Sequence, residues 1–102
     1  MEFDFAEIVS FGWDRGNLTK SAQKHAITPE EAEEVFFRQP WVIVDTRPED
    51  REPRWAVIGP SERDRILRVL FTIRGRMIRP ISCRPASRGE RSAYEKALRQ
   101  RG

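Results

Sequence analysis

Arginine is the residue type in this sequence best suited to chemistry on a phosphate group. Sixteen of the nineteen basic side chains are Arg, whose planar guanidinium can donate paired hydrogen bonds to phosphate oxygens. Arg54, Arg68, Arg79 and Arg84 fall within segments that alternate as β-strands do. Neighbouring antiparallel strands could gather them on one face, where they would hold a phosphodiester. Alternatively, each pairs across strands with a carboxylate and is structural; the candidate carboxylates are Asp45, Glu90 and Glu95.

The charge is divided unevenly along the chain, although its formal net value is only +3. Residues 1–50 carry five basic and eleven acidic side chains, whereas residues 51–102 carry fourteen basic and five acidic ones. A basic half of this kind indicates contact with an anionic polymer, and a merely solvated face is the alternative.

Cys83 and His25 are the sole cysteine and histidine among the 102 residues. One of each cannot form an internal disulfide, or a zinc site of Cys and His ligands within one chain. With His25 as its only candidate base, Cys83 is expected to pack as a small apolar residue. The sequence has no glycine-rich phosphate loop and no nucleophile elbow. We therefore predict neither a metal nor a cofactor.

Membrane and secretion signals are also absent from the sequence. Apolar runs such as Trp41–Val44 are far shorter than the roughly 18 residues of a membrane span. The segment Met1–Phe5 has neither the basic nor the apolar region of a secretory signal. These features predict a cytoplasmic protein without a membrane partner, and the length predicts a single domain over residues 1–102.

Two helices are predicted early in the chain. The first begins at the capping residue Asp14 and ends before Pro29. The second begins at Thr28–Pro29, where a cap precedes a proline at the first helical position, and Pro40 ends it. Their inner stripes consist of Leu18, Ala22 and His25 in the first helix, and Ala32, Val35 and Phe36 in the second.

After Pro40 the apolar period becomes 2, which indicates strands. Four are predicted, over Trp41–Thr46, Arg54–Gly59, Ile66–Ile73 and Arg76–Arg84. Their short connections predict an antiparallel meander. Because Pro80 cannot donate a ladder hydrogen bond, the fourth strand should be an edge there or carry a bulge. Ile8–Phe11 is a candidate fifth strand.

A last helix opens at the capping box Ser87-Arg-Gly-Glu90. Its expected inner face consists of Ala93, Tyr94, Ala97 and Leu98. Because helices and strands occupy separate parts of the sequence, we predict an α+β, two-layer domain. It would have a mainly antiparallel sheet of four to five strands, two N-terminal helices and one C-terminal helix.

Two groups of residues resemble the BrnT family of toxins. The N-terminal group is Phe11-Gly-Trp-Asp14, Gly16-Asn17, Lys20, Lys24-His25 and Pro29–Phe37. The C-terminal group is Arg54–Gly59, Ile78-Arg79, Ile81-Ser82, Arg84, Ala86, Glu90 and Tyr94. Their order and spacing match over about residues 11–94. The sequence departs from the family pattern at Ala26, where the family has Gly, and at Pro80 and Cys83.

The resemblance implies a RelE-like fold and a ribonuclease toxin of a type II toxin–antitoxin system. A BrnA-like antitoxin would bind and neutralise it, and operator DNA would be contacted only through the antitoxin complex. RelE-like toxins cleave RNA without a metal: the ribose 2′-hydroxyl attacks the adjacent phosphate, and cations stabilise the transition-state charge. RNA is therefore the expected substrate.

The candidate site residues each have a structural alternative. The expected catalytic residues are Arg54, Arg79, Arg84, His25 and Glu90, and the expected RNA-binding residues are Lys20, Lys24, Arg68 and Tyr94. His25 could instead hydrogen-bond to free carbonyls at the end of a helix, and Glu90 could belong only to the capping box. Tyr94 could pack in the core. Two other functions remain open: a non-catalytic nucleic-acid-binding regulator, and a module whose only partner is an antitoxin.

Overall fold

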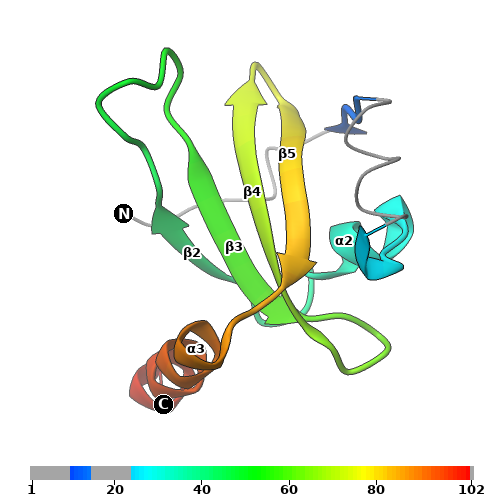
Figure 1. The fold of residues 1–102 in the computed structure, drawn as a ribbon, viewed down its shortest axis with the longest axis vertical. Coiled ribbons are helices and arrows are strands. Elements are labelled where there is room, and N and C mark those ends of the chain that lie inside the picture. Colours follow the sequence, from blue (N-terminus) through cyan, green and yellow to red (C-terminus); the bar gives the residue numbers. More distant parts are fainter. Residues whose placement is uncertain (1–9, 15–23, 102) are drawn as a thin grey trace.

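The computed structural model describes residues 10–14 and 24–101, which form one five-stranded sheet with two helices (Figure 1). The strand order is β1-β5-β4-β3-β2. The strands are β1 (Ser10–Phe11), β2 (Trp41–Val44), β3 (Trp55–Pro60), β4 (Ile66–Arg74) and β5 (Met77–Pro85). The helices are α2 (Pro29–Glu34) and α3 (Arg88–Arg101). The predicted α+β class is confirmed.

Strands β2 to β5 form the predicted antiparallel meander, because each follows its neighbour through a short connection. Strand β1 differs, since it pairs in parallel with β5, with Ser10 opposite Met77 and Phe11 opposite Ile78. It arrives from the other end of the chain and therefore needs no tight turn.

Helix α2 begins as predicted. The Thr28 Oγ1 atom accepts a hydrogen bond from the Glu31 backbone nitrogen at 3.1 Å, and Pro29 stands in the first helical turn. The helix ends at Glu34, well before Pro40, because the amides of Phe36 and Phe37 bond to carbonyls three residues back instead of four.

The hydrophobic core lies between α2 and one face of the sheet. The Phe36 ring meets the Phe71 ring edge-on, with centroids 5.1 Å apart. Cys83 belongs to this core, and burial raises the pKa of its thiol to about 12. The prediction that Cys83 packs as an apolar residue is confirmed. Other members of the core are Ile27, Ala32, Val35, Val57, Leu67, Val69 and Ile78.

Strand β5 carries a bulge at the proline, as predicted. Leu70 lies opposite Ser82 and the next residue, Phe71, lies opposite Pro80, so Ile81 has no partner in the ladder. The strand is nevertheless interior to the sheet, with β4 on one side and β1 on the other. Strand β1 is only two residues long and ends at Phe11, opposite Ile78. Pro80 therefore has no pairing partner in β1, and no ladder hydrogen bond to β1 is lost there.

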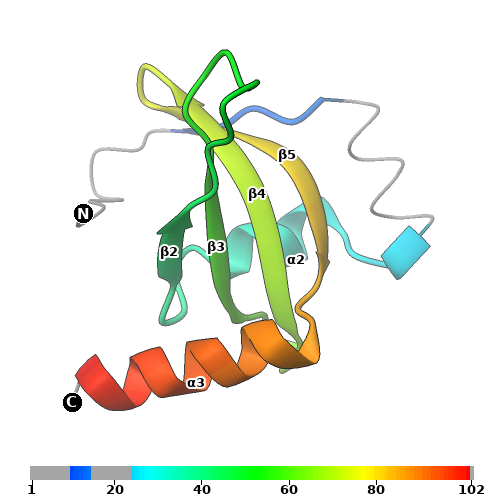
Figure 2. The same ribbon diagram turned by 60° about the vertical axis from the view of Figure 1, so that its left-hand side comes forward.

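Helix α3 begins at the predicted capping box: the Glu90 carboxylate accepts from the Ser87 amide at 2.8 Å, and the Ser87 hydroxyl accepts from the Glu90 amide at 3.2 Å. Figure 2 shows α3 across the lower end of the sheet, on the side away from α2. The predicted two-layer domain is therefore wrong in helix placement, because α2 and α3 do not pack together on one face of the sheet. Burial of Tyr94, whose hydroxyl donates to the Gln39 carbonyl at 2.8 Å, fixes α3 there.

The first predicted helix lies mostly outside the described residues, and so do Leu18, Lys20 and Ala22. Its last residues, Lys24 and His25, are helical. Ala26 follows in the left-handed conformation, with φ of 53°. A non-glycine residue pays roughly 1–2 kcal/mol for this conformation, so the family's Gly at this position has a clear physical basis.

Candidate phosphate-binding face

The sheet face away from α2 carries arginines from neighbouring strands. Residues directly opposite each other in an antiparallel pair point to the same side. On this face Arg68 lies opposite Arg84, and Thr72 lies opposite Arg79. The prediction that neighbouring strands gather the strand arginines on one face is met for these three. We call this surface the open face.

The bulge in β5 is what places both β5 arginines on the open face. Arg79 and Arg84 are five residues apart, so a regular strand would point them to opposite sides. The extra residue, Ile81, shifts the alternation by one, and both side chains then face away from the core.

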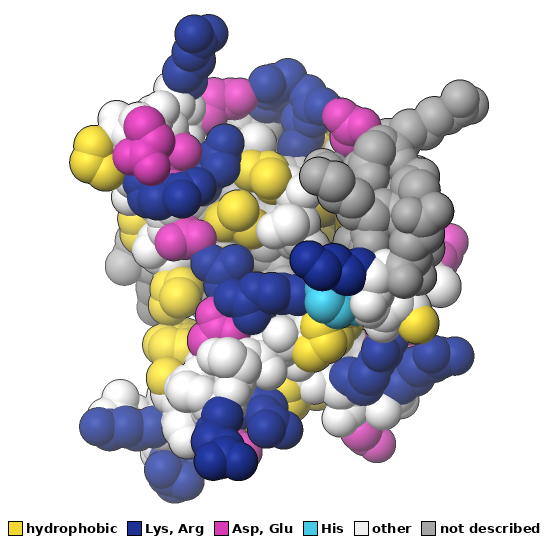
Figure 3. Space-filling view, viewed as in Figure 1, with side chains coloured by type: hydrophobic (Ala, Val, Ile, Leu, Met, Phe, Trp, Pro, Cys, Tyr) yellow, Lys and Arg dark blue, Asp and Glu magenta, His cyan; other side chains and the backbone are white. Residues whose placement is uncertain are grey.

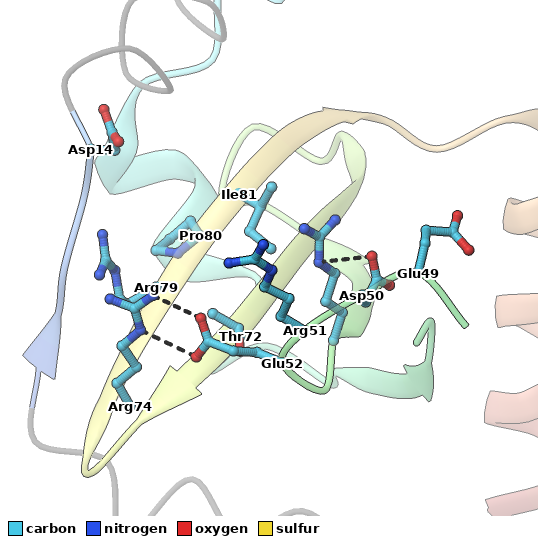
Figure 4. Close-up of a pocket in the computed structure, with 11 residues that line it drawn as sticks. Asp14, Glu49, Asp50, Arg51, Glu52, Thr72, Arg74, Arg79, Pro80 and Ile81 are labelled. Carbon is cyan, nitrogen blue, oxygen red and sulfur yellow. Dashed lines mark hydrogen bonds and ion pairs between the residues drawn. The ribbon is translucent and has the colours of Figure 1, made fainter. Parts of the chain in front are cut away.

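A pocket of about 400 Å³ lies on the open face, at the end farther from α3 (Figure 4). The β4–β5 pair supplies Thr72, Arg74 and Arg79, and the start of β3 supplies Arg54. The loop over residues 49–52 forms another wall. The pocket thus brings together Arg54 and Arg79, the two residues expected to stabilise charge.

The arginines of the pocket differ in how far carboxylates neutralise them. Arg74 holds Glu52 by two hydrogen bonds, Nη2 to Oε1 at 2.7 Å and Nε to Oε2 at 3.2 Å, which lower the pKa of the Glu52 carboxyl. Arg54 Nε lies 3.5 Å from Asp50 Oδ1. Among the described residues Arg79 forms no hydrogen bond or ion pair, and the Glu52 carboxyl, whose pKa Arg79 also helps to lower, is bonded to Arg74. The Arg79 guanidinium can therefore bind an anion without breaking a hydrogen bond.

The loop between β2 and β3 holds Arg54 in place through contacts that sequence reasoning missed. The Asp50 carboxylate, 4% exposed, accepts a hydrogen bond from the Arg47 amide at 2.8 Å. Thr46 Oγ1 accepts from the Arg54 amide at 2.8 Å. The dense charge of residues 47–53 is the signal in the sequence that points to such contacts.

At the other end of the open face, arginines and carboxylates neutralise each other. Arg84 donates to both Glu90 oxygens, at 2.7 and 2.9 Å. Arg68 Nε lies 3.1 Å from Glu90, and its Nη2 pairs with Asp45. The structural alternative, pairing with Asp45 or Glu90, therefore holds for Arg68 and Arg84.

The pairing with Arg84 and the bonds from Ser87 hold the pKa of the Glu90 carboxyl at about 2, against 4.5 for the free group. A carboxyl whose pKa is lowered by folding stabilises the fold above pH 4.5 and loses this effect as the pH falls toward 2. We therefore expect Glu90→Gln to lower the melting temperature at pH 7. The deficit should shrink steadily below pH 4.5. Thermal melts of both proteins from pH 7 to pH 2 measure this, and a deficit that is constant with pH would contradict the electrostatic origin.

Arg65 holds the backbone at His25 and at the residue that follows it. The half-buried His25 has its carbonyl bonded to Arg65 Nη1 at 3.2 Å, and Ala26 has its carbonyl bonded to Arg65 Nη2 at 3.0 Å. Arg65 in turn is paired with the buried Glu31, which also accepts from the Ser61 hydroxyl at 2.7 Å. In Figure 3 the histidine borders a band of Lys and Arg side chains.

The remaining candidates divide between core, surface and undescribed residues. Tyr94 is 2% exposed, so its ring presents no free face on which a base could stack. Lys24 is exposed, and Lys20 lies outside the described residues. In the part of the chain that the structure describes, no three His, Cys, Asp or Glu side chains cluster as metal ligands would. None of the described helices is long and apolar enough to cross a membrane.

The fold and the site define a small α+β protein with an arginine-lined pocket on one face of its sheet. The family described as "Ribonuclease toxin, BrnT, of type II toxin-antitoxin system" matches residues 13–90. The chain therefore belongs to the BrnT family of ribonuclease toxins.

The fold is similar to the crystal structure of the Brucella abortus ribonuclease toxin BrnT, with a TM-score of 0.59 and 22% sequence identity. That likeness covers 78% of this chain and 97% of the Brucella chain. A comparison with curated proteins finds no significant match.

Proposed function

We propose that this BrnT-family toxin cleaves RNA in the pocket of Arg54 and Arg79, without a metal ion. The observation that carries the proposal is the uncommitted Arg79 guanidinium beside Arg54, in a pocket that is open to solvent on a sheet face. An antitoxin partner and an RNA substrate follow from the family.

In the proposed reaction the ribose 2′-oxygen attacks the adjacent phosphorus and its proton leaves through solvent water. The bond from phosphorus to the 5′-oxygen breaks, and that oxygen takes up a proton from water, so the products are a 2′,3′-cyclic phosphate and a 5′-hydroxyl. Negative charge grows on the phosphoryl oxygens as the new bond forms. The Arg79 and Arg54 guanidiniums donate hydrogen bonds to those oxygens. The sheet and the β2–β3 loop hold the two guanidiniums in position before the reaction begins. We assign a neighbouring phosphate to the exposed Lys24, with Lys20 as a further candidate, whereas Arg84 and Arg68 keep their pairing with Glu90.

His25 and Glu90 do not line the pocket, so we assign them supporting roles on the open face. Glu90 stays ionised above its low pKa and holds Arg84 and Arg68 in position. His25, the sole histidine of the sequence, borders the same basic band and stays our candidate for proton transfer.

Cleavage should persist in EDTA, because the pocket supplies its own cations for the developing charge. We expect a labelled single-stranded RNA to be cut at the same rate with and without chelator. Arg79→Ala protein, purified in parallel, controls for a contaminating nuclease and should be nearly inactive. Loss of cleavage in EDTA, with recovery on addition of magnesium, would contradict the metal-free mechanism.

We further propose that the partner is a BrnA-like antitoxin, that both act in the cytoplasm, and that operator DNA is bound only by their complex. The main rival is a non-catalytic regulator that grips nucleic acid on the same open face. Cleavage of RNA by the purified toxin distinguishes the two, because the rival predicts binding without products.

A further inference from the structure

Helix α3 carries basic side chains that the fold does not use. Arg88, Arg91, Lys96 and Arg99 are all exposed. Among the described residues none of these four forms an ion pair, in contrast to the neutralised Arg68 and Arg84. A charge that holds no partner contributes little to the stability of the fold.

The spacing places these four side chains on one side of the helix. At 100° per residue, positions 88, 91, 96 and 99 fall within an arc of about 140°, and Tyr94 lies on the other side, against the sheet. From Arg88 to Arg99 the row is about 16 Å long at the α-helical rise. Glu95 is the only acidic residue in this arc.

The basic side of α3 is accessible from the same direction as the open face. Figures 1 and 2 both show α3 at the lower end of the sheet, and Figure 3 shows dark-blue side chains over it. The contact of Arg68 with Glu90, at 3.1 Å, joins the open face directly to the first turn of α3. A polymer leaving the pocket along β5 would therefore reach α3.

We propose that α3 is a second binding site for the RNA backbone, so that one RNA strand is held both in the pocket and along the helix. This inference rests on the proposed function, since it takes the pocket as the place of cleavage. Between them lies the length of β5 from Arg79 to Arg84, about 16 Å at the strand rise. A dinucleotide has one phosphodiester and can occupy only one of the two sites.

The side-chain types on α3 favour a phosphate backbone over a protein partner. Protein interfaces place aromatic and aliphatic side chains at their centre. The exposed large hydrophobic residues of the described chain are Phe37 and Val44, and neither belongs to α3. Arginines that hold no carboxylate are free to bind the successive phosphates of a nucleic-acid backbone.

The test compares two double variants that remove the same charge. Arg91→Ala/Arg99→Ala alters α3, whereas Arg63→Ala/Arg76→Ala removes one exposed arginine from the β3–β4 turn and one from the β4–β5 turn, both outside α3. Binding of a labelled single-stranded RNA of roughly 20 nucleotides is measured against salt. We expect the α3 variant to reduce the salt slope by about 1.4, at 0.7 for each lost contact, and the affinity by about tenfold. The control should change both far less.

Cleavage adds a second readout. The ratio of kcat/KM for the long RNA to that for a dinucleotide should fall about tenfold in the α3 variant. Equal salt slopes for the two double variants would overturn the inference, as would lost binding of the antitoxin with unchanged RNA binding. If wild-type protein binds RNA but never cleaves it, the proposed function fails while the salt slopes still decide the role of α3.

Discussion

Replacing Arg79 by Ala should lower the single-turnover rate of RNA cleavage by about a hundredfold or more. The expected reason is that Arg79 meets charge that develops only in the transition state, so its loss affects the rate and not the ground state. RNA binding should weaken only a few-fold, because many other cations remain on the open face and α3. Arg54→Ala is expected to have an effect of the same order, since Arg54 lines the same pocket.

Arg76→Ala is the matched control for Arg79→Ala. It removes an exposed arginine from the β4–β5 turn without altering the pocket, and it should cleave RNA like the wild type. Circular dichroism and melting curves must agree among the three proteins. If cleavage and binding fall by the same factor in Arg79→Ala, the residue grips phosphate and does not stabilise the transition state.

Expression of the toxin alone should arrest bacterial growth, and co-expression of a BrnA-like antitoxin should restore it. The physical reason is that uncontrolled cleavage of cellular RNA stops protein synthesis, while a bound antitoxin blocks the enzyme. Colony counts after induction, with and without the antitoxin gene, measure the effect, which we expect to be several orders of magnitude.

Cells expressing Arg79→Ala provide the control for growth arrest. They should grow at nearly the normal rate at the same level of soluble protein. If Arg79→Ala arrests growth as strongly as the wild type does, toxicity does not depend on the pocket. Normal growth on high expression of the wild type would contradict the function itself.

Local signals in the sequence were sufficient to predict where most elements begin. Thr28–Pro29 and Ser87–Glu90 mark the starts of α2 and α3, because their side chains bond amides within the same turn. The lost amide of Pro80 predicted either an edge position or a bulge, and the structure has the bulge. The position of α3 was not predictable in this way. It depends on the hydrogen bond from the Tyr94 hydroxyl to the Gln39 carbonyl, and these residues are 55 positions apart in the sequence.

The sequence predicted which arginines lie on the sheet, but not which of them enter the pocket and which pair with carboxylates. Arg54 and Arg79 meet in the pocket, whereas Arg84 and Arg68 are held by Glu90. Which arginine finds a carboxylate depends on strand register and on how a loop folds back. Neither is encoded in the spacing of the arginines themselves.

The bulge in β5 determines how many residues can separate two side chains that share a face. Ile78 and Cys83 are both in the core and, like Arg79 and Arg84, are five residues apart. Deleting Ile81 would leave each pair four residues apart, the even spacing at which a regular strand already points two side chains to one side. Loss of the bulge and loss of one residue therefore compensate each other, whereas a one-residue change that keeps the bulge would bring a guanidinium into the core. We expect a β5 strand in this family that lacks the bulge to be one residue shorter between these positions.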